Sequence, residues 1–559
     1  MKKSRKMFTS ILAVLLLMST ASGCFAKPPE GDSVEQIDTS KAQLNIGHHL
    51  TGYGEDWLLE TKRLFEDYYK DTKFGDKVGV QVMIQNEDSA FGEGAIKSSL
   101  STFKNDIYYL HQVSQPELFV KSNLFMDITS WVTENIYDEN GNLAADTGKT
   151  ATQSIVDTMY DDYAAAFNFG TTEAPKYYHL PWRLGVGGII YDADLFNEKE
   201  LFLLDDNGTI GGTYADIEAG NCSKGPDGEL GTEDDGLPNT WEQFKKLLKT
   251  MADSEHNVTP FTWSSATNYQ RREMLNYIAA NYEGENDWRL NYSFSGTDSE
   301  FGEINGNDKA SYNKLRGQQG KKAAIQAAYD IINGNYYSNR VINNNHLGAE
   351  SEFVQSGTQG ANPVAMLFEG GWWEIEAKPY FAEAAKVDSS YAYGNRNYKV
   401  LPTPNFVGTE GIADKEFSER ILTASGATTT EFVWADSPNK DLAKLWVQFT
   451  HSRECLSLFT KETSAFRPYD FVPTTEEKAA YTKYTQSIYA LIEEGAIVIS
   501  DLDTATAKKA SPGTYNESNW DTSLAIGTKV YTDALQAFRT DSTLTVAKAF
   551  QGMKDRIIG

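Results

Sequence analysis

Cysteine is scarce in this chain of 559 residues, which contains three. Cys222 and Cys455 are far apart and have neither the spacing of a metal site nor that of a disulfide framework. We therefore expect both to be ordinary thiols. Cys24 differs from them, because it follows an apolar segment close to the N-terminus.

Positive charge is also in short supply. Lys and Arg number 51 against 78 Asp and Glu, which gives a formal net charge of −27. This excess of acid argues against nucleic acid, and against an anionic membrane surface, as the binding partner. The length exceeds what one simple hydrophobic core holds, so we expect two or more domains.

Recognisable catalytic motifs are absent as well. The sequence has no Gly-x-Ser-x-Gly elbow, no His-Glu-x-x-His and no glycine loop for phosphate. Hydrolysis of a glycan would need two carboxylates at a defined separation, and no local signature marks such a pair. Binding needs only shape, stacking faces and hydrogen bonds in a pocket. The sequence favours a binding protein, with an extracellular glycan-processing enzyme (a glycoside hydrolase or lyase) as the alternative.

The N-terminal residues have the pattern of an export signal. Basic residues at 2–6 precede the apolar run 11–18, and the small residues 19–23 lead to Cys24. The apolar run is too short to cross a bilayer, which takes roughly 20 residues. We therefore expect residues 1–23 to be removed as a signal peptide.

The end of this signal resembles the bacterial lipobox, in which the cysteine becomes the lipidated first residue. The motif is Ala21-Ser22-Gly23-Cys24, with Ala21 in the position where leucine is usual. We expect Cys24 to be lipidated and the polar residues 24–43 to form a flexible tether to the outer face of the cell membrane. The alternative is a plain secreted protein.

The next segments alternate between strand and helix patterns. Apolar residues predict strands at 44–47, 78–84 and 107–110, with a helix around Trp57 after the first of them. Such alternation is typical of a parallel α/β sheet. Ligands of these sheets bind beyond the carboxyl ends of the strands. That rule places Tyr53, Asn86-Glu87 and His111-Gln112 at a cleft.

The most informative stretch runs from residue 178 to residue 244. Residues 186–190 form an apolar run after glycines, typical of a buried strand, and residues 191–196 continue as a short helix. Thr240 and Gln243 form a capping box ahead of apolar residues at helical spacing. This stretch resembles the crossover segment of bacterial extracellular sugar-binding proteins of ABC importers, of the maltose-binding type (family 1).

Further segments resemble the same family, namely 365–372 (Ala-Met-x-x-x-Gly-x-Trp), 438–446 (Pro-Asn-Lys-Asp-Leu-Ala-Lys) and 463–471. The resemblance implies an α/β, two-lobed periplasmic-binding-protein-like fold (type II), with parallel-type sheets flanked by helices. The expected division is residues 44–180 plus 430–475 for lobe 1, residues 181–429 plus 476–559 for lobe 2, and hinges near 181–188 and 424–427.

The function implied by the resemblance is capture of an oligosaccharide in the cleft between the lobes and its delivery to the permease subunits of an ABC transporter. Such a protein acts as a monomer. The hinge segments would absorb the change in backbone angles when the lobes close.

The ligand-binding residues are expected where aromatic rings meet polar groups. Trp372 occupies the position whose tryptophan stacks on sugar in the family, and its neighbour Trp373 is expected in the core. Trp263 and Trp182 follow or lie within apolar strands and are further candidates for stacking. Three polar residues lie beside these rings or at the end of an early strand, where they could bind sugar hydroxyls: Tyr53, Arg183 and Glu369.

An acidic, glycine-rich insert occupies residues 205–237. So many carboxylates repel one another unless they are solvated or bridged by a hard cation, and calcium takes 6–8 oxygen ligands in flexible geometry. The insert resembles acidic calcium loops of sugar-binding lipoproteins, although it lacks the spacing of an EF-hand. The predicted structural Ca²⁺ ligands are Asp205, Asp227, Asp234 and Asp235. A solvated acidic hairpin is the alternative.

Overall fold

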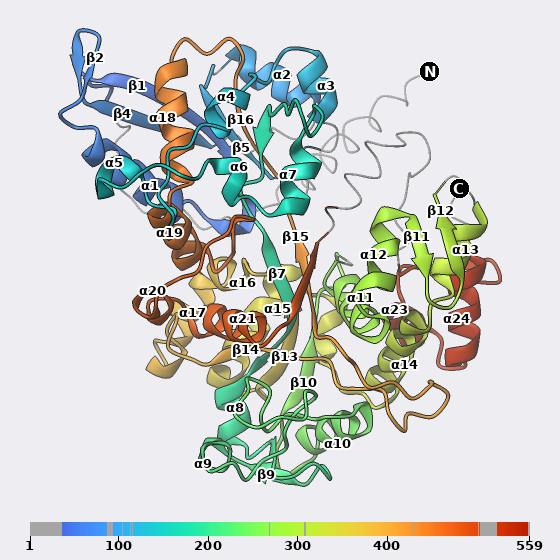
Figure 1. Ribbon diagram of the computed structural model, residues 1–559. Coiled ribbons are helices and arrows are strands. Elements are labelled where there is room, and N and C mark those ends of the chain that lie inside the picture. The colour runs from blue at the N-terminus through green and yellow to red at the C-terminus, as the bar shows by residue number, and fades with distance from the viewer. Residues whose placement is uncertain are drawn as a thin grey trace, which may run out of the picture.

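The computed structural model describes residues 36–86, 93–102, 104–111, 113, 116–267, 269–306, 309–426, 429–500, 502 and 522–556. The predicted signal peptide, Cys24, Glu87 and Gln112 lie outside these residues. In the described part, the chain forms two α/β lobes connected by β7 (Gly185–Asp192) and β15 (Ile421–Ser425), as Figure 1 shows. Within the same part, no helix combines the length and apolarity needed to cross a membrane.

The first lobe contains a five-stranded sheet in the order β4 (Val80–Asn86), β1 (Ala42–His49), β5 (Ile107–Leu110), β16 (Thr430–Val433) and β6 (His179–Leu180). β1 runs parallel to both β4 and β5, and β16 runs antiparallel to β5 and β6. The strands predicted from apolar alternation are confirmed as β1, β4 and β5. Leu44, Ile46, Val80 and Val82 point into the core because alternate residues of a strand face the same side.

The second lobe contains a six-stranded sheet built around β7. Its order is β10 (Thr259–Thr262), β13 (Val364–Glu369), β7, β15 and β17 (Ile497–Ser500), and β14 (Tyr398–Leu401) also pairs with β7. All eight residues of β7 are buried, so its continuous apolar run is the pattern of a central strand.

Both sheets are mixed, which corrects the prediction of parallel-type sheets. β7 is antiparallel to β13, β14 and β15, while β10 and β13 are parallel, as are β15 and β17. The antiparallel pairing of β7 with β15 follows from the way the chain passes between the lobes. β7 carries the chain into the second lobe and β15 carries it back, so these neighbouring strands must run in opposite directions.

Helices flank both sheets. Around the first sheet lie α1 (Asp56–Tyr68), α2 (Glu93–Thr102), α3 (Pro116–Lys121), α4 (Thr129–Val132), α5 (Ala144–Thr147), α6 (Ile155–Thr158), α7 (Asp161–Phe167), α18 (Lys440–Thr450) and α19 (Arg453–Thr463). Those that follow or flank the second sheet are α8 (Ala193–Glu198), α9 (Tyr214–Glu218), α10 (Trp241–Met251), α11 (Tyr269–Glu283), α12 (Glu285–Ser293), α13 (Lys309–Arg316), α14 (Gln319–Asn333), α15 (His346–Gln355), α16 (Trp373–Glu376), α17 (Lys378–Ala384), α20 (Thr475–Ala479), α21 (Lys483–Glu493), α23 (Ala534–Thr540) and α24 (Val546–Asp555).

Short elements complete the fold. Two-residue to four-residue strands form the hairpins β2 (Lys73–Phe74) with β3 (Lys77–Val78), β8 (Phe202–Leu203) with β9 (Ile210–Gly212), β11 (Ser295–Asp298) with β12 (Gly302–Asn305), and β18 (Leu524–Ile526) with β19 (Lys529–Tyr531). The 3₁₀ turns are η1 (Thr51–Tyr53), η2 (Asn339–Ile342), η3 (Ser356–Gln359) and η4 (Ser389–Tyr391).

Helix α10 begins as the sequence predicts. Thr240 is its N-cap, and the side chains of Thr240 and Gln243 accept hydrogen bonds reciprocally from each other's backbone in a capping box. The apolar positions at helical spacing face the core, and Trp241 donates its ring N–H to Asp330 at 2.8 Å. The helix therefore anchors the end of the acidic insert to the second lobe.

Candidate ligand-binding cleft

A cavity of about 460 Å³ lies where the two lobes meet. Its lining comes from η1 and the residue after β5 in the first lobe, from β7, β15 and the crossover before β7, and from α11, α15, β13 and α16 in the second lobe. The volume is in the range of 300–1,000 Å³ that is usual for small-molecule sites. The cavity also lies at carboxyl ends of strands, where ligands of α/β sheets bind.

Four of the six predicted ligand-binding residues line this cavity: Tyr53, Arg183, Glu369 and Trp372. They come from segments far apart in the sequence. Tyr53 belongs to the η1 turn and Arg183 to the crossover between β6 and β7, whereas Glu369 ends β13 and Trp372 lies three residues later. The fold therefore brings them to one place, from both lobes.

Trp372 is the half-buried aromatic ring of the cavity. Its ring centroid lies 5.7 Å from that of Tyr53, with the planes tilted by 59°. Glycine makes room for the indole, because a Cβ on Gly370 would collide with the ring and a Cβ on Gly185 would lie 3.2 Å from it. Trp373 is fully buried among Phe353, Phe381, Tyr398 and Tyr484, which confirms that it belongs to the core.

Tyr53, Arg183 and His111 form a hydrogen-bonded chain on the first-lobe side. Arg183 Nη1 donates to the Tyr53 hydroxyl at 2.6 Å, and Nη2 donates to His111 Nδ1 at 2.7 Å. Burial raises the pKa of Tyr53 to about 12. Burial, together with the Arg183 charge, lowers the pKa of His111 to about 2. Both neighbours of Arg183 are therefore neutral at physiological pH.

Glu369 lies at the second-lobe side of the cavity and is fully buried. Its Oε2 accepts hydrogen bonds from the Tyr269 hydroxyl at 2.6 Å and from Gln270 Nε2 at 2.5 Å. Burial raises the pKa of Glu369 to about 8, with a further contribution from the charge of Glu376. This carboxyl is thus held neutral at pH 7 by its surroundings.

Trp182 is a correction to the predicted site. It is fully buried, stacks on Trp57 with centroids 5.9 Å apart, and donates its ring N–H to the carbonyl oxygen of Leu110 at 2.9 Å. Neither face of its indole is open to the cavity. Its edge lies against Tyr53, with centroids 5.8 Å apart, so it supports a cleft residue from behind.

Trp263 is a second correction. It follows the edge strand β10, is 3% exposed, and packs on Tyr337 with centroids 5.1 Å apart. It does not line the cavity. An apolar strand predicts where a tryptophan enters the fold, but it does not predict which way the ring points after the strand has ended.

Several residues of the cleft were not predicted from the sequence, including Tyr269, Arg272 and Glu376. Tyr269 and Arg272 lie on the first turn of α11, just beyond the carboxyl end of β10, and that position was a usable signal. Glu376 approaches the first lobe, since a Cβ on Gly52 would lie 2.6 Å from its carboxyl group. Nothing local in the sequence indicates that contact.

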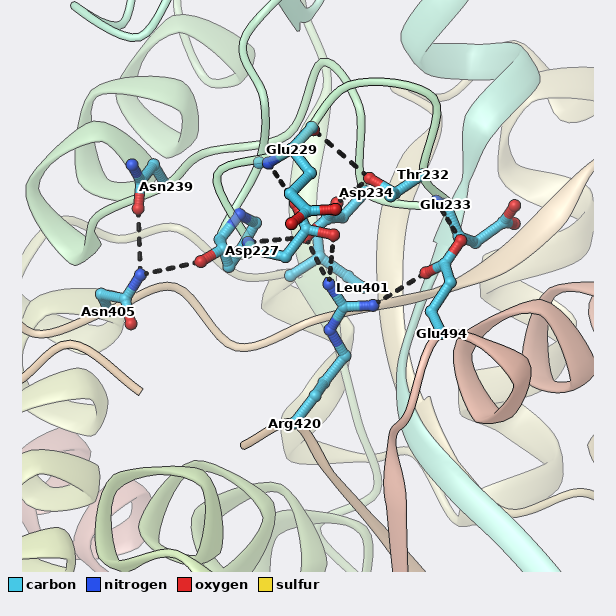
Figure 2. Close-up of polar contacts among 12 residues, drawn as sticks. Asp227, Glu229, Thr232, Glu233, Asp234, Asn239, Leu401, Asn405, Arg420 and Glu494 are labelled. Atoms are coloured by element: carbon cyan, nitrogen blue, oxygen red, sulfur yellow. Dashed lines mark hydrogen bonds and ion pairs between the residues drawn. The ribbon is translucent and has the colours of Figure 1, made fainter. Parts of the chain in front are cut away.

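The acidic insert packs against Arg420, as Figure 2 shows, and none of its residues lines the cleft cavity. Arg420 Nη2 donates to Asp234 Oδ2 at 2.8 Å and lies 3.2 Å from Asp227 Oδ2. Its Nη1 donates to Glu494 Oε2 at 3.0 Å. Burial raises the pKa of Asp234 to about 6, while Arg420 acts in the opposite direction. The guanidinium provides a positive charge at the place where the sequence predicts calcium.

The four predicted metal ligands do not come together as one group. Asp205 is half-buried and accepts hydrogen bonds from Asn207 and Thr209 within its own turn. Asp227 and Asp234 bind Arg420, and Asp235 accepts from the backbone of Gly231 at 2.7 Å. Across the described ranges, no group of three or more His, Cys, Asp or Glu is arranged to hold a metal ion.

The fold and the cleft together define a class of protein. Two α/β lobes joined by crossing strands, with a cavity between them that draws its lining from both, are the architecture of a two-lobed solute-binding protein. The sequence model of the family described as "Bacterial extracellular solute-binding protein" matches residues 60–454. The chain belongs to this family. A search of curated proteins returned no match.

Two solved structures share the fold. One, from a study of xylan utilisation by the thermophilic bacterium Caldanaerobius polysaccharolyticus, is 15% identical with a TM-score of 0.52, and the match covers 92% of this chain and 100% of that one. The other, a probable secreted solute-binding lipoprotein from Streptomyces coelicolor, is 9% identical with a TM-score of 0.52, and the match covers 92% and 98%. At these identities the likeness concerns the fold alone.

Proposed function

We propose that this protein is the extracellular substrate-binding component of an ABC importer and captures an oligosaccharide in the cleft between its lobes. The observation that carries the proposal is the half-buried indole of Trp372 at the cavity, beside the polar groups of Tyr53, Arg183 and Glu369. A pyranose presents an apolar face of C–H groups and a rim of hydroxyls. A flat aromatic ring with hydrogen-bonding groups at its edge suits both features.

The place of the cavity supports a capture mechanism. The chain crosses between the lobes near residues 181–184 and again after β15, and the Leu184 and Phe466 backbones bond to each other beside the first crossing, at 2.6 and 3.0 Å. Rotation at these few residues would open and close the cleft around a ligand. The closed form would then be delivered to the permease subunits. The xylan-utilisation context of one structural neighbour also favours a carbohydrate.

A thermal-shift screen against a panel of neutral and acidic oligosaccharides tests the proposal. A ligand at about 100 times its Kd should stabilise the folded protein by roughly 2.7 kcal/mol. At least one oligosaccharide of the panel should therefore raise the melting temperature by several degrees. If monosaccharides, amino acids or peptides shift the melting curve and no oligosaccharide does, the proposal is wrong.

The alternative is a glycan-processing enzyme, and one observation favours it. Glu369 lies in the wall of the cavity with a pKa raised to about 8, and glycosidases require a protonated carboxyl as general acid. However, its Oε2 is bound by Tyr269 and Gln270, and the side chain is fully buried. These contacts argue against Glu369 as a general acid. Incubation with the panel should release no new reducing ends, and their appearance would favour the enzyme.

Attachment to the membrane through Cys24 stays a prediction of the sequence. Replacing Cys24 by alanine should release the protein from the membrane fraction and leave its ligand affinity unchanged. Retention of the variant in the membrane fraction would contradict lipidation at this residue.

Calcium in the acidic insert also stays a prediction. Asp235 Oδ1 is buried without a hydrogen-bond partner and offers one free oxygen, whereas Asp227 and Asp234 would have to exchange Arg420 for the ion. If calcium binds, a chelator should lower the melting temperature and added calcium should restore it. An unchanged melting curve would leave Arg420 as the counter-charge of the insert.

A further inference from the structure

Arg183 is a buried cation that has no anionic partner among the residues that the structure describes. Its side chain lines the cavity and the residue is 3% exposed, yet it forms no ion pair with any described carboxylate. Three other buried arginines, Arg271, Arg396 and Arg467, are paired with carboxylates. Arg271 binds Asp533 at 2.9 Å, and Arg467 binds Glu431 at 3.0 Å. Buried charges are normally paired because the loss of hydration is costly.

The immediate neighbours of Arg183 do not cancel its charge. Tyr53 keeps its proton and His111 is neutral, as the directions of their pKa shifts show. The guanidinium carbon lies 4.5 Å from the centroid of the Tyr53 ring and 5.6 Å from that of Trp182. Such cation–π contacts are worth about 0.5–2 kcal/mol and leave the net charge in place. Arg183 Nε is buried and has no hydrogen-bond acceptor.

The carboxyl groups at the cavity do not supply the missing anion either. Glu273 pairs with Arg272 at 2.7 Å, and Glu369 is occupied by Tyr269 and Gln270. Glu376 lines the cavity without an ion pair to Arg183, and burial raises its pKa. The cavity thus presents a guanidinium next to carboxyl groups that bind other residues or form no ion pair with it.

We propose that the ligand captured in the cleft is an anionic oligosaccharide, whose carboxylate or sulfate group binds the guanidinium of Arg183. This inference rests on the proposed function and narrows the class of sugar. The planar guanidinium matches carboxylate and sulfate oxygens, and its buried Nε–H has no acceptor among the described residues. The overall charge of −27 disfavours anions at long range. Salt screens that repulsion beyond about 8 Å, whereas the contact in the cleft is shielded from solvent.

The wild-type protein and chemically paired ligands provide the first test. Calorimetric titrations compare oligouronates of several linkages with the same oligosaccharides after reduction of their carboxyl groups to alcohols. A charge-assisted hydrogen bond contributes roughly 1.5–3 kcal/mol, so the acidic form should bind about 10- to 100-fold more tightly than the reduced form. Sulfated oligosaccharides and their desulfated forms make the second pair and distinguish the two sources of the anion.

The outcomes separate this inference from the proposed function. If neutral or reduced oligosaccharides bind as tightly as every acidic form, the cleft takes a neutral sugar, and only the inference fails. If no oligosaccharide of either kind binds, the proposed function fails with it. A preference for either the carboxylate or the sulfate form supports the inference and identifies the group.

The variant Arg183→Gln tests whether the preference depends on this side chain. It should reduce the ratio of affinities for acidic and reduced ligands to about one, whatever its effect on the affinity for the reduced ligand. Arg63→Gln is the matched control, since Arg63 is exposed in α1 and pairs with Glu60. That control should keep the full preference. An undiminished preference in a folded Arg183→Gln protein would overturn the assignment.

Discussion

One arginine lies in the cleft and another packs against the acidic insert, and their surroundings differ in charge. Arg420, which packs against the insert, has carboxylates of Asp227, Asp234 and Glu494 within 3.2 Å. Arg183 in the cleft has a phenol and a neutral imidazole instead. An arginine surrounded by carboxylates holds the fold together, whereas one without them keeps an unsatisfied charge where a ligand can reach it. The comparison separates a structural role from a binding role for the same residue type.

The largest expected effect is on stability, from removal of Arg420. In Arg420→Met, the buried Asp234 would lie close to Asp227 with no cation between them. Breaking a buried ion pair by removing one partner costs about 3–5 kcal/mol, so we expect a loss of about 4 kcal/mol in unfolding free energy. Urea denaturation at pH 7 measures it.

Arg183→Met is the matched variant in the cleft. It leaves no carboxylate unpaired, and it removes a buried charge, so the unfolding free energy should change by less than about 1 kcal/mol. If both variants lose the same stability, Arg183 is structural as well and the contrast between the two regions disappears.

A somewhat smaller effect on stability is expected from pH, through ionisation of Glu374 in α16. Its carboxyl group is fully buried and accepts hydrogen bonds from Ser464 at 3.0 Å and Thr482 at 2.5 Å. Burial raises its pKa from the ordinary 4.5 to about 7. The folded state therefore holds this proton more tightly than the unfolded state does. The contribution of the Glu374 proton to the unfolding free energy is fully present below pH 4.5 and is lost as pH rises to about 7.

The shift in the pKa of Glu374 corresponds to about 3 kcal/mol of unfolding free energy, at 1.36 kcal/mol for each pKa unit. Glu374→Gln should flatten the dependence of unfolding free energy on pH between about 4.5 and 7.5 by roughly that amount. Denaturation curves of both proteins at several pH values measure the difference. Parallel pH profiles would mean that Glu374 is ionised in the folded protein.

The sequence predicted those parts of the fold that depend on local patterns. β5 has the predicted bounds Ile107–Leu110, and Thr240 caps α10, because apolar periodicity and capping are properties of short segments. The direction of β7 relative to β15 was not predictable in this way. It depends on two crossings between lobes that lie more than two hundred residues apart in the chain.

The site was predicted only in part, because local patterns are visible in the sequence and contacts between distant segments are not. Glu369 ends a buried strand and Trp372 follows it, and the resemblance to a family marked their segment. Trp182 and Trp263 had equally suitable positions in the sequence, but their rings are covered by Trp57 and Tyr337, which come from other segments. Burial of a single ring is decided by neighbours distant in sequence, so local pattern cannot distinguish a stacking surface from a core residue.

The most direct test of the central claim, that the cleft holds the sugar, is calorimetric titration of the wild type and Trp372→Ala with the tightest oligosaccharide of the panel. A tryptophan buries about 150–250 Å², and a sugar ring covering a third of it at about 25 cal/mol per Å² contributes on the order of 1.5 kcal/mol. We predict at least roughly tenfold weaker binding with little change in stability, because the free indole is only half-buried. Equal affinities, or a variant that unfolds, would contradict the account and place the sugar elsewhere.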